Sequence, residues 1–228
     1  MGKKYFIAGT DTDVGKTLIT TALLAKAASQ GLSTAAIKPV AAGCEQTEQG
    51  LRNDDALALM AAMTLDLPYQ QVNPVALEPA IAPHIAAGQQ NKPLRVTQLA
   101  GFCRGVFMQR SDLLLVEGAG GWRVPLNRVE TLADLAKELQ LPVILVVGIK
   151  LGCINHALLT IEAIQRDGLP VAGWVANRID PTMSCYEENV ATLKALISAP
   201  LLGEVPYLEK RDRELAANYL DMTSLQLN

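Results

Sequence analysis

Short apolar segments alternate along the chain with longer segments whose apolar residues recur at helical spacing. Most of the short segments are apolar without alternation, which is typical of strands covered on both faces of a parallel sheet. We predict strands at Tyr5–Ala8, Thr34–Val40, Leu113–Val116, Val143–Val147, Val171–Ala176 and Leu201–Val205. We predict helices at Thr17–Ser29, Asp54–Met63, Val96–Gln109, Leu132–Leu139, Asn155–Asp167 and Ser184–Ile197. This order predicts an α/β fold with a mostly parallel β-sheet flanked by helices.

The segment Asn73–Pro93 is the least regular part of the chain, since it contains four prolines and Gly88. Apolar residues persist through it, so we interpret it as a long functional loop or a broken helical segment rather than a linker. With 228 residues the chain is long enough to bury the core of one domain. We therefore expect residues 1–228 to form a single domain.

Composition excludes several classes of protein. Half of the residues are hydrophobic and 19% are charged, as in a compact globular protein. The net charge of -3 and the scattered lysines and arginines give no basic surface for nucleic acid. No apolar run approaches the roughly 20 residues that span a bilayer, and no basic-then-apolar leader is visible, so we expect a cytoplasmic protein without membrane segments. Cys44, Cys103, Cys153 and Cys185 form no C-x-x-C pair, so we expect reduced thiols.

The clearest motif is G-T-D-T-D-V-G-K-T from Gly9 to Thr17, between the first predicted strand and the first predicted helix. In this context a phosphate-binding loop (P-loop) cradles phosphates with backbone N–H groups, while Lys16 neutralises the outer phosphates and the Thr17 hydroxyl coordinates Mg²⁺. ATP or GTP is the expected ligand. The alternative is a strand-to-helix turn that binds no ligand, with Lys16 as a solvated lysine in the first turn of the helix.

The loop has one residue more than the usual spacing, because five residues separate Gly9 from Gly15. The additional length places Asp11, Thr12 and Asp13 beside the expected γ-phosphate. A second substrate would lie there.

Three further residues are candidates for the same site. Glu117 ends an apolar strand and precedes a glycine-rich run, which favours a metal ligand over an ordinary strand-end carboxylate. Asp55 follows Asn53 at a helix start, where a helix cap with a first-turn acid and a metal ligand are equally good readings. Lys38 stands at a strand end, where a site-facing lysine and a snorkelling surface lysine are also equally good.

Together these segments resemble the dethiobiotin synthetase family of biotin biosynthesis, over most of the chain. The segments that carry the resemblance are the P-loop, K-P-V-A from Lys38, G-L-R-N-D-D-A from Gly50, V-E-G-A-G-G-W from Val116, P-V-I-L-V-V-G-I-K-L-G-C-I-N-H-A from Pro142, G-W-V-A-N from Gly173 and P-L-L-G-E-V-P-Y-L from Pro200. Jointly they are far more specific than a P-loop alone.

The resemblance implies a homodimeric, Mg²⁺-dependent ligase that joins CO₂ to 7,8-diaminononanoate and closes a cyclic urea while ATP becomes ADP and phosphate. One substrate amine forms a carbamate, ATP phosphorylates the carbamate, and the neighbouring amine attacks the mixed anhydride. In such a reaction the protein mainly positions the groups and stabilises charge.

The resemblance also implies roles for individual residues. The implied Mg²⁺ ligands are Thr17, Asp55 and Glu117. Lys16 and Lys38 match lysines that stabilise the carbamate and the transferring phosphoryl group, and Thr12 faces the substrate. The implied nucleotide site comprises Asp13, Val14, Gly15, Lys16, Thr17, Leu18, Asp55, Glu117, Gly118, Ala119, Gly120, Asn177, Pro206, Tyr207 and Leu208.

The resemblance further implies that Gly152, Cys153 and Asn155 open a helix that receives the substrate carboxylate of the partner subunit. From the residues alone, a glycine-containing loop with Asn155 as helix cap is an equally good reading. The chain departs from the family at Ala42, where relatives often carry a serine that contacts the substrate. The departure suggests lower affinity, or a paralogue that acts on a related diamine.

Two other functions are weaker alternatives. Corrinoid amidating ligases usually carry a glutamine-hydrolysing domain, for which 228 residues leave no room. Partitioning or regulatory ATPases typically place a lysine near the start of the P-loop, and residues 10–14 contain none.

Overall fold

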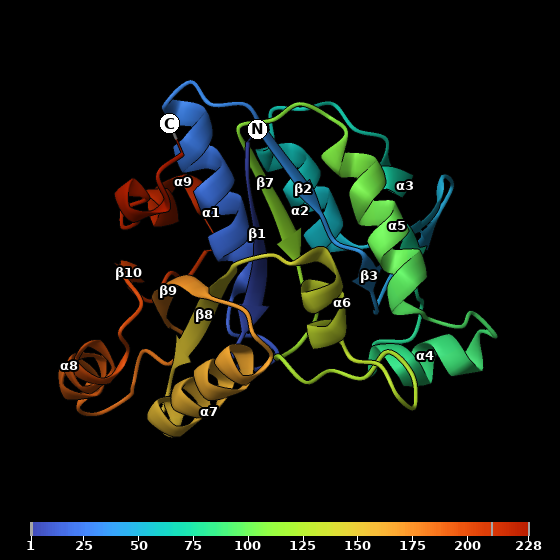
Figure 1. Cartoon of the computed structure of the whole chain (residues 1–228). Helices are drawn as coiled ribbons and strands as arrows, with labels where there is room; N and C mark the ends of the chain where they lie inside the picture. The colour runs from blue at the N-terminus through green and yellow to red at the C-terminus, as the bar shows by residue number, and fades with distance from the viewer. Residues whose placement is uncertain (1, 211, 228) are drawn as a thin grey trace.

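The computed structural model describes residues 2–210 and 212–227 and has a parallel six-stranded sheet at its centre (Figure 1). The strand order is β10-β9-β8-β1-β7-β2. The strands are β1 (Lys3–Gly9), β2 (Thr34–Ile37), β7 (Leu113–Glu117), β8 (Val143–Ile149), β9 (Val171–Arg178) and β10 (Leu201–Val205). The predicted α/β fold with a parallel sheet is confirmed.

The long helices cover both faces of the sheet. They are α1 (Lys16–Ser29), α2 (Asp54–Ala62), α5 (Val96–Phe107), α6 (Leu132–Leu139), α7 (Cys153–Arg166) and α8 (Tyr186–Leu196). Helix α1 packs against α2, and α5 packs against α6 on the other face (Figure 1). Since both faces are covered, β7 and β8 are buried at every position, which is why their sequences are apolar apart from Glu117 at the end of β7.

Several short elements have no counterpart in the sequence prediction. They are β3 (Val40–Ala41), β4 (Glu45–Thr47), β5 (Gly50–Arg52), α3 (Tyr69–Val72), β6 (Val75–Ala76), α4 (Pro83–Gln89), α9 (Arg213–Ala217) and a 3-10 helix at Thr223–Leu225. Strands β3 and β6 pair with each other, and β4 and β5 form a hairpin. Residues 73–93 contain the strand β6 as well as the short helix α4, so the broken helical segment is confirmed only for α4, and the strand was not predicted.

One predicted strand is wrong in its extent. The segment Thr34–Val40 is divided, because β2 ends at Ile37 and Val40 belongs to the separate strand β3. Pro39 lacks a backbone N–H and restricts Lys38 before it, so the chain leaves the sheet at this point.

The register of the sheet decides which residues can meet. Ile37 of β2 lies opposite Val116 of β7, and Ile7 of β1 lies opposite Glu117. Neighbouring strands are about 4.8 Å apart, so the residues that follow these positions emerge close together at the carboxyl edge of the sheet. Among the described helices, none is both long and apolar enough to cross a membrane.

Gly203 on β10 offers a test of this packing. A Cβ atom at this position would overlap the backbone oxygen of Tyr219, which cannot move without shifting the C-terminal segment. We predict that Gly203→Ala lowers the free energy of unfolding by about 1–3 kcal/mol, measured by urea unfolding. Gly101→Ala is the matched control, because a Cβ atom there meets nothing within 4 Å. The control should be neutral or stabilise the protein by about 0.5–1 kcal/mol; equal unfolding midpoints for the two variants would contradict the prediction.

Candidate active site

The P-loop connects β1 to α1 and turns sharply at Gly15, whose φ is 88°. A Cβ atom at Gly15 would overlap the side-chain amide of Asn177, so both the backbone conformation and the close contact require glycine. Asn177, near the end of β9, donates a hydrogen bond from Nδ2 to the Val14 oxygen at 2.8 Å. The loop is therefore braced by a strand that lies two strands away in the sheet.

The N-terminus of α1 is suited to an anion. Gly15 is the N-cap residue without a side-chain cap, and the first turn of α1, which the structure describes fully, contains no acidic residue. Lys16 folds over the loop and donates from Nζ to the Asp11 oxygen at 3.0 Å. Free N–H groups and a lysine at one helix end form a phosphate site.

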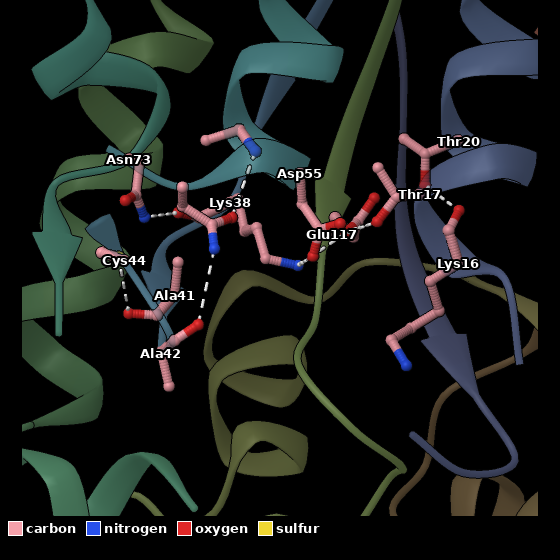
Figure 2. A network of polar contacts seen from close by, with 12 residues as sticks. Lys16, Thr17, Thr20, Lys38, Ala41, Ala42, Cys44, Asp55, Asn73 and Glu117 are labelled. Atoms are coloured by element: carbon pink, nitrogen blue, oxygen red, sulfur yellow. Dashed lines mark hydrogen bonds and ion pairs between the residues drawn. The ribbon is translucent and has the colours of Figure 1, made fainter. Parts of the chain in front are cut away.

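Lys38 lies between two carboxylates, one of which also accepts a hydrogen bond from Thr17 of the P-loop (Figure 2). Its Nζ lies 2.7 Å from Oε1 of Glu117 and 2.9 Å from Oδ2 of Asp55. The Thr17 hydroxyl donates to the same Oε1 of Glu117 at 2.9 Å. Four elements of the chain thus converge on one cluster of oxygen atoms. The surface-lysine reading of Lys38 is wrong, because only 4% of the residue is exposed.

Burial and charge act in opposite directions on the two lysines. Burial and the neighbouring Lys38 ammonium lower the pKa of Lys16 to about 8. Burial also disfavours the charged form of Lys38, but the Glu117 and Asp55 carboxylates outweigh burial and raise its pKa. Burial opposes ionisation of Asp55, yet the Lys38 ammonium holds the pKa of this carboxyl below its ordinary value. Lys38 and Asp55 are therefore both charged at neutral pH.

A buried polar network fixes the backbone around Lys38. Its N–H donates to the Val72 oxygen at 2.7 Å, and its carbonyl accepts from Nδ2 of Asn73 at 2.8 Å. The Tyr69 hydroxyl donates to Oδ1 of Asn73 and accepts from the Asn53 N–H. Asn53 is the N-cap of α2, as predicted, and accepts from the Ala56 N–H. The helix that carries Asp55 and the segment that carries Lys38 are thus held by one network.

Lys38, Asp55 and residues of the P-loop border a cavity of about 680 Å³. Polar groups from Thr12, Lys16, Lys38 and Asp55 stand in its wall. The other predicted site residues in its wall are Asp13, Gly15, Thr17, Leu18, Ala42, Ala119 and Gly120. Glu117 lies behind Lys38 and is fully buried, and its Oε2 has no hydrogen-bond partner among the residues that the structure describes. The cavity is large enough for a small organic substrate beside the phosphate loop.

Part of the cavity wall was missed by the sequence prediction. It consists of Ala80, Ile81, Ala82, Pro83, Arg123, Val124 and Pro125, which are mostly apolar. The signal for residues 80–83 was the persistence of apolar residues through the irregular segment. Arg123 is two residues beyond the predicted glycine run, but the sequence does not show on which side of the site the loop continues.

Other predicted residues lie outside this cavity. Val14 is fully buried within the P-loop, Gly118 packs on the Phe6 ring, and Pro206, Tyr207 and Leu208 follow the end of β10. Asn177 is near the carboxyl end of β9, and the last three residues follow the carboxyl end of β10, at the same edge of the sheet as the P-loop.

The start of α7 differs from the prediction. The helix begins at Cys153 with Gly152 as N-cap, two residues earlier than predicted, so the reading of Asn155 as cap is wrong. A left-handed conformation at Gly152 (φ 92°) makes the earlier start possible. The Cys153 side chain is fully buried, and its N–H donates to the Lys150 oxygen. Asn155 is exposed, and no hydrogen bond of its side chain is among those of the described residues.

All four cysteines are free thiols, as predicted. Among residues 2–210 and 212–227, no three His, Cys, Asp or Glu side chains are grouped so as to hold a metal. Thr17, Asp55 and Glu117 nevertheless supply a hydroxyl and two carboxylates, and oxygen ligands are those that Mg²⁺ prefers.

Comparison with known proteins finds a family model and close relatives that match nearly the whole chain. Residues 3–214 match the family model described as an AAA domain. The chain is 62% identical to the ATP-dependent dethiobiotin synthetase BioD of Cellvibrio japonicus (strain Ueda107) over 98% of this chain and 97% of the relative. It is 57% identical to the protein of the same name from Pseudomonas paraeruginosa, over 97% of each chain.

Solved structures support the fold alone. The cell division protein FtsY of Thermotoga maritima aligns with a TM-score of 0.52 and 13% identity, over 96% of this chain and 68% of that one. The signal recognition particle receptor FtsY of Elizabethkingia anophelis aligns with a TM-score of 0.51 and 13% identity, over 96% of this chain and 65% of that one.

The low pKa of Lys16 predicts proton uptake on nucleotide binding. Phosphate oxygens favour the charged ammonium, so binding raises a pKa that is about 8 in the free protein. Above pH 8 the free protein has lost part of this charge, so nucleotide affinity should fall as pH rises and each binding event should take up as much as about one proton. Calorimetry at pH 8.5 in buffers of different ionisation enthalpy measures this uptake. Lys150→Met, which removes an exposed partner of Asp11, should keep it; absence of uptake in the unmodified protein would refute the prediction.

Proposed function

The chain belongs to the ATP-dependent dethiobiotin synthetase family, and we propose that it carboxylates 7,8-diaminononanoate with CO₂ and closes the ureido ring of dethiobiotin at the expense of ATP. The observation that carries the proposal is the convergence of a phosphate loop, two lysines and the Asp55 carboxylate on the wall of one cavity, with the buried Glu117 carboxylate paired to Lys38. A nucleotide switch of the partitioning or regulatory type would need no second-substrate cavity beside its phosphate loop.

The proposed reaction has three steps. One amine of the diamine attacks CO₂ and loses a proton, which gives a carbamate. A carbamate oxygen attacks the γ-phosphorus of ATP, and ADP leaves. The second amine then attacks the carbonyl carbon of the mixed anhydride, phosphate leaves, and the ring is closed. Each step needs close approach and charge stabilisation rather than a protein nucleophile.

The chain's own residues can meet these needs. Lys16, at the start of α1, stabilises charge on the outer phosphates, and Lys38 stabilises the carbamate and the transferring phosphoryl group. Thr12 stands in the cavity wall beside Gly120, within the P-loop segment that has the additional residue. These positions support Thr12 as a contact to the carbamate or its amine.

We infer that Thr17, Asp55 and Glu117 hold Mg²⁺. Their oxygen atoms lie around one point, and the buried Oε2 of Glu117 lacks a hydrogen-bond partner. Such an atom fits a ligand that accepts lone pairs. When bound, Mg²⁺ would neutralise charge on the β- and γ-phosphates.

The nucleotide base would lie at the carboxyl ends of β9 and β10. Asn177 is near the end of β9, Pro206–Leu208 follow β10, and Tyr207 is 43% exposed. The exposed Tyr207 ring can stack on adenine, and Asn177, whose Nδ2 bonds the Val14 oxygen, keeps its Oδ1 as an acceptor. We propose that this edge holds the base while α1 holds the phosphates.

The apolar part of the cavity suits the alkyl chain of the diamine. Ile81, Pro83, Val124 and Pro125 line the cavity with apolar side chains. Ala42 also lines it and presents a methyl group where the family resemblance leads us to expect a hydroxyl. Binding of the diamine must therefore depend on the remaining contacts, and a related diamine substrate is the alternative that this difference favours.

We further propose a cytoplasmic homodimer in which residues 1–228 act as one ligase domain. Near the start of α7, Leu151 is 88% exposed and Leu159 is 57% exposed, which suits contact with a second subunit. The helix start at Gly152, with the exposed Asn155, suits the carboxylate of a substrate held by that subunit. Because Cys153 is buried, its side chain would not touch the substrate.

The first prediction concerns coupling of ATP to the two other substrates. Release of ADP should require both 7,8-diaminononanoate and bicarbonate or CO₂, because the γ-phosphoryl group has no acceptor before the carbamate forms. A coupled spectrophotometric ADP assay with each component omitted measures this requirement. Equal ADP release without the diamine would refute the ligase function and favour a regulatory ATPase.

A second prediction concerns Lys38. Lys38→Ala should lower kcat by about 10²- to 10³-fold, because it removes a charge that stabilises the transferring group. Nucleotide binding, measured by calorimetry, should survive because Lys16 and the helix N-terminus are unchanged. Lys137→Ala is the control, because the ion pair of Lys137 is with Asp134 on α6. Its kcat should equal that of the unmodified chain. An unaffected kcat in Lys38→Ala would remove Lys38 from the catalytic site.

A further inference from the structure

The Lys38 ammonium lies where a cation between Asp55 and Glu117 would lie. It bonds Oε1 of Glu117 and Oδ2 of Asp55, and the Thr17 hydroxyl bonds the same Oε1 (Figure 2). These are the residues that the proposed function assigns to Mg²⁺. Asp55 and Glu117, which come from distant parts of the chain, therefore bond a lysine rather than solvent through these oxygens.

The same oxygen atoms cannot serve both cations at once. Mg²⁺ binds its ligands at about 2.0–2.1 Å and demands near-octahedral geometry. An ammonium 2.7 Å from Oε1 of Glu117 and 2.9 Å from Oδ2 of Asp55 would lie in contact with such an ion. The two positive charges would repel each other strongly in a site of low dielectric. Lys38 must leave Oε1 of Glu117 and Oδ2 of Asp55 before these two oxygens can bind a metal.

Lys38 already pairs with both carboxylates without any metal. Its ammonium lies within ion-pair distance of Asp55 and Glu117, and Lys16 stands in the same cavity wall. A divalent cation alone would bring excess positive charge into a buried site. A nucleotide with its phosphates would bring the negative charge that gives the Lys38 ammonium a new partner.

The side chain of Lys38 can move although its backbone cannot. The N–H and the carbonyl are fixed by Val72 and Asn73, and Pro39 follows. The four-carbon side chain stands in the cavity wall beside Thr12 and Lys16, so rotation of its side-chain torsions carries the ammonium into the cavity.

We propose that Lys38 is an internal counter-ion that holds the metal-binding carboxylates until metal and nucleotide enter together, and that its release delivers the ammonium to the transferring phosphoryl group. This proposal rests on the proposed assignment of Asp55 and Glu117 as metal ligands. It makes Lys38 a positioning residue for the metal site in addition to its role in charge stabilisation, and it predicts that a divalent cation binds poorly without nucleotide.

The test measures binding of Mn²⁺ alone to the nucleotide-free protein by electron paramagnetic resonance of the free ion. Lys38→Met should bind Mn²⁺ about tenfold or more tightly than the unmodified chain, because both carboxylates become available and uncompensated. Lys16→Met is the matched control: it removes a charge from the same group, but its Nζ bonds the Asp11 oxygen and neither carboxylate. The control should change the affinity by much less.

Equal affinities for the Lys38→Met and Lys16→Met variants would overturn the proposal, since charge alone would then explain the effect. The gain should disappear in Lys38→Met combined with Glu117→Gln; a gain that persists would also overturn it, because the ion would then bind elsewhere.

A crystal structure of the unmodified chain with Mg²⁺ and a non-hydrolysable ATP analogue does not depend on the folding of a variant. The Lys38 ammonium should be out of hydrogen-bond reach of both carboxylates and close to the phosphates. An ammonium that still bonds Asp55 and Glu117 would overturn the counter-ion role, while diamine-dependent ADP release would still support the ligase function.

Discussion

The buried ion pairs between Lys38 and the carboxylates of Asp55 and Glu117 are the interaction on which the site depends. Each partner comes from a different element, and each would be costly to bury alone. Their mutual neutralisation lets Glu117 lie with no exposed surface at the end of β7 while Lys38 lies beside it. The polar centre of the protein is thus stable before any ligand enters.

The parallel sheet makes this pairing possible. The register of β2 on β7 puts Ile37 opposite Val116, so Lys38, which follows β2, lies beside Glu117, the last residue of β7. The register of β1 on β7 puts the P-loop next to the same point. Ion pairing, phosphate binding and the cavity therefore share one edge of the sheet, as expected where parallel strands end.

Sequence patterns predicted the continuous, buried parts of the fold well. Strand β10 and helix α6 match their predicted bounds, since an apolar run and a helical apolar stripe each leave a direct periodic signal. The hairpin of β4 and β5 left none, because β4 is exposed at every position. The two-residue strands β3 and β6 depend on pairing across the irregular segment, which no local pattern reports.

The site was predictable as a set of residues but not as a geometry. The P-loop motif identified Lys16 and Thr17 by its spacing, whereas Lys38 and Asp55 each had two equally good readings. Only the tertiary contact between them decides, because 17 positions separate them along the chain and a buried network through Asn73 and Tyr69 holds them in place. The cap reading of this helix start is confirmed, since Asn53 caps α2 while Asp55 pairs with Lys38, and the metal-ligand reading of Asp55 stays a prediction.

The most direct test of the composite site as a ring-forming ligase is the fate of the carbon atom. Incubation with ¹³C-bicarbonate, ATP and 7,8-diaminononanoate, followed by mass spectrometry, should yield dethiobiotin with the label in the ureido carbonyl, in equal amount to the ADP released. ADP formation without a labelled cyclic urea would contradict this function.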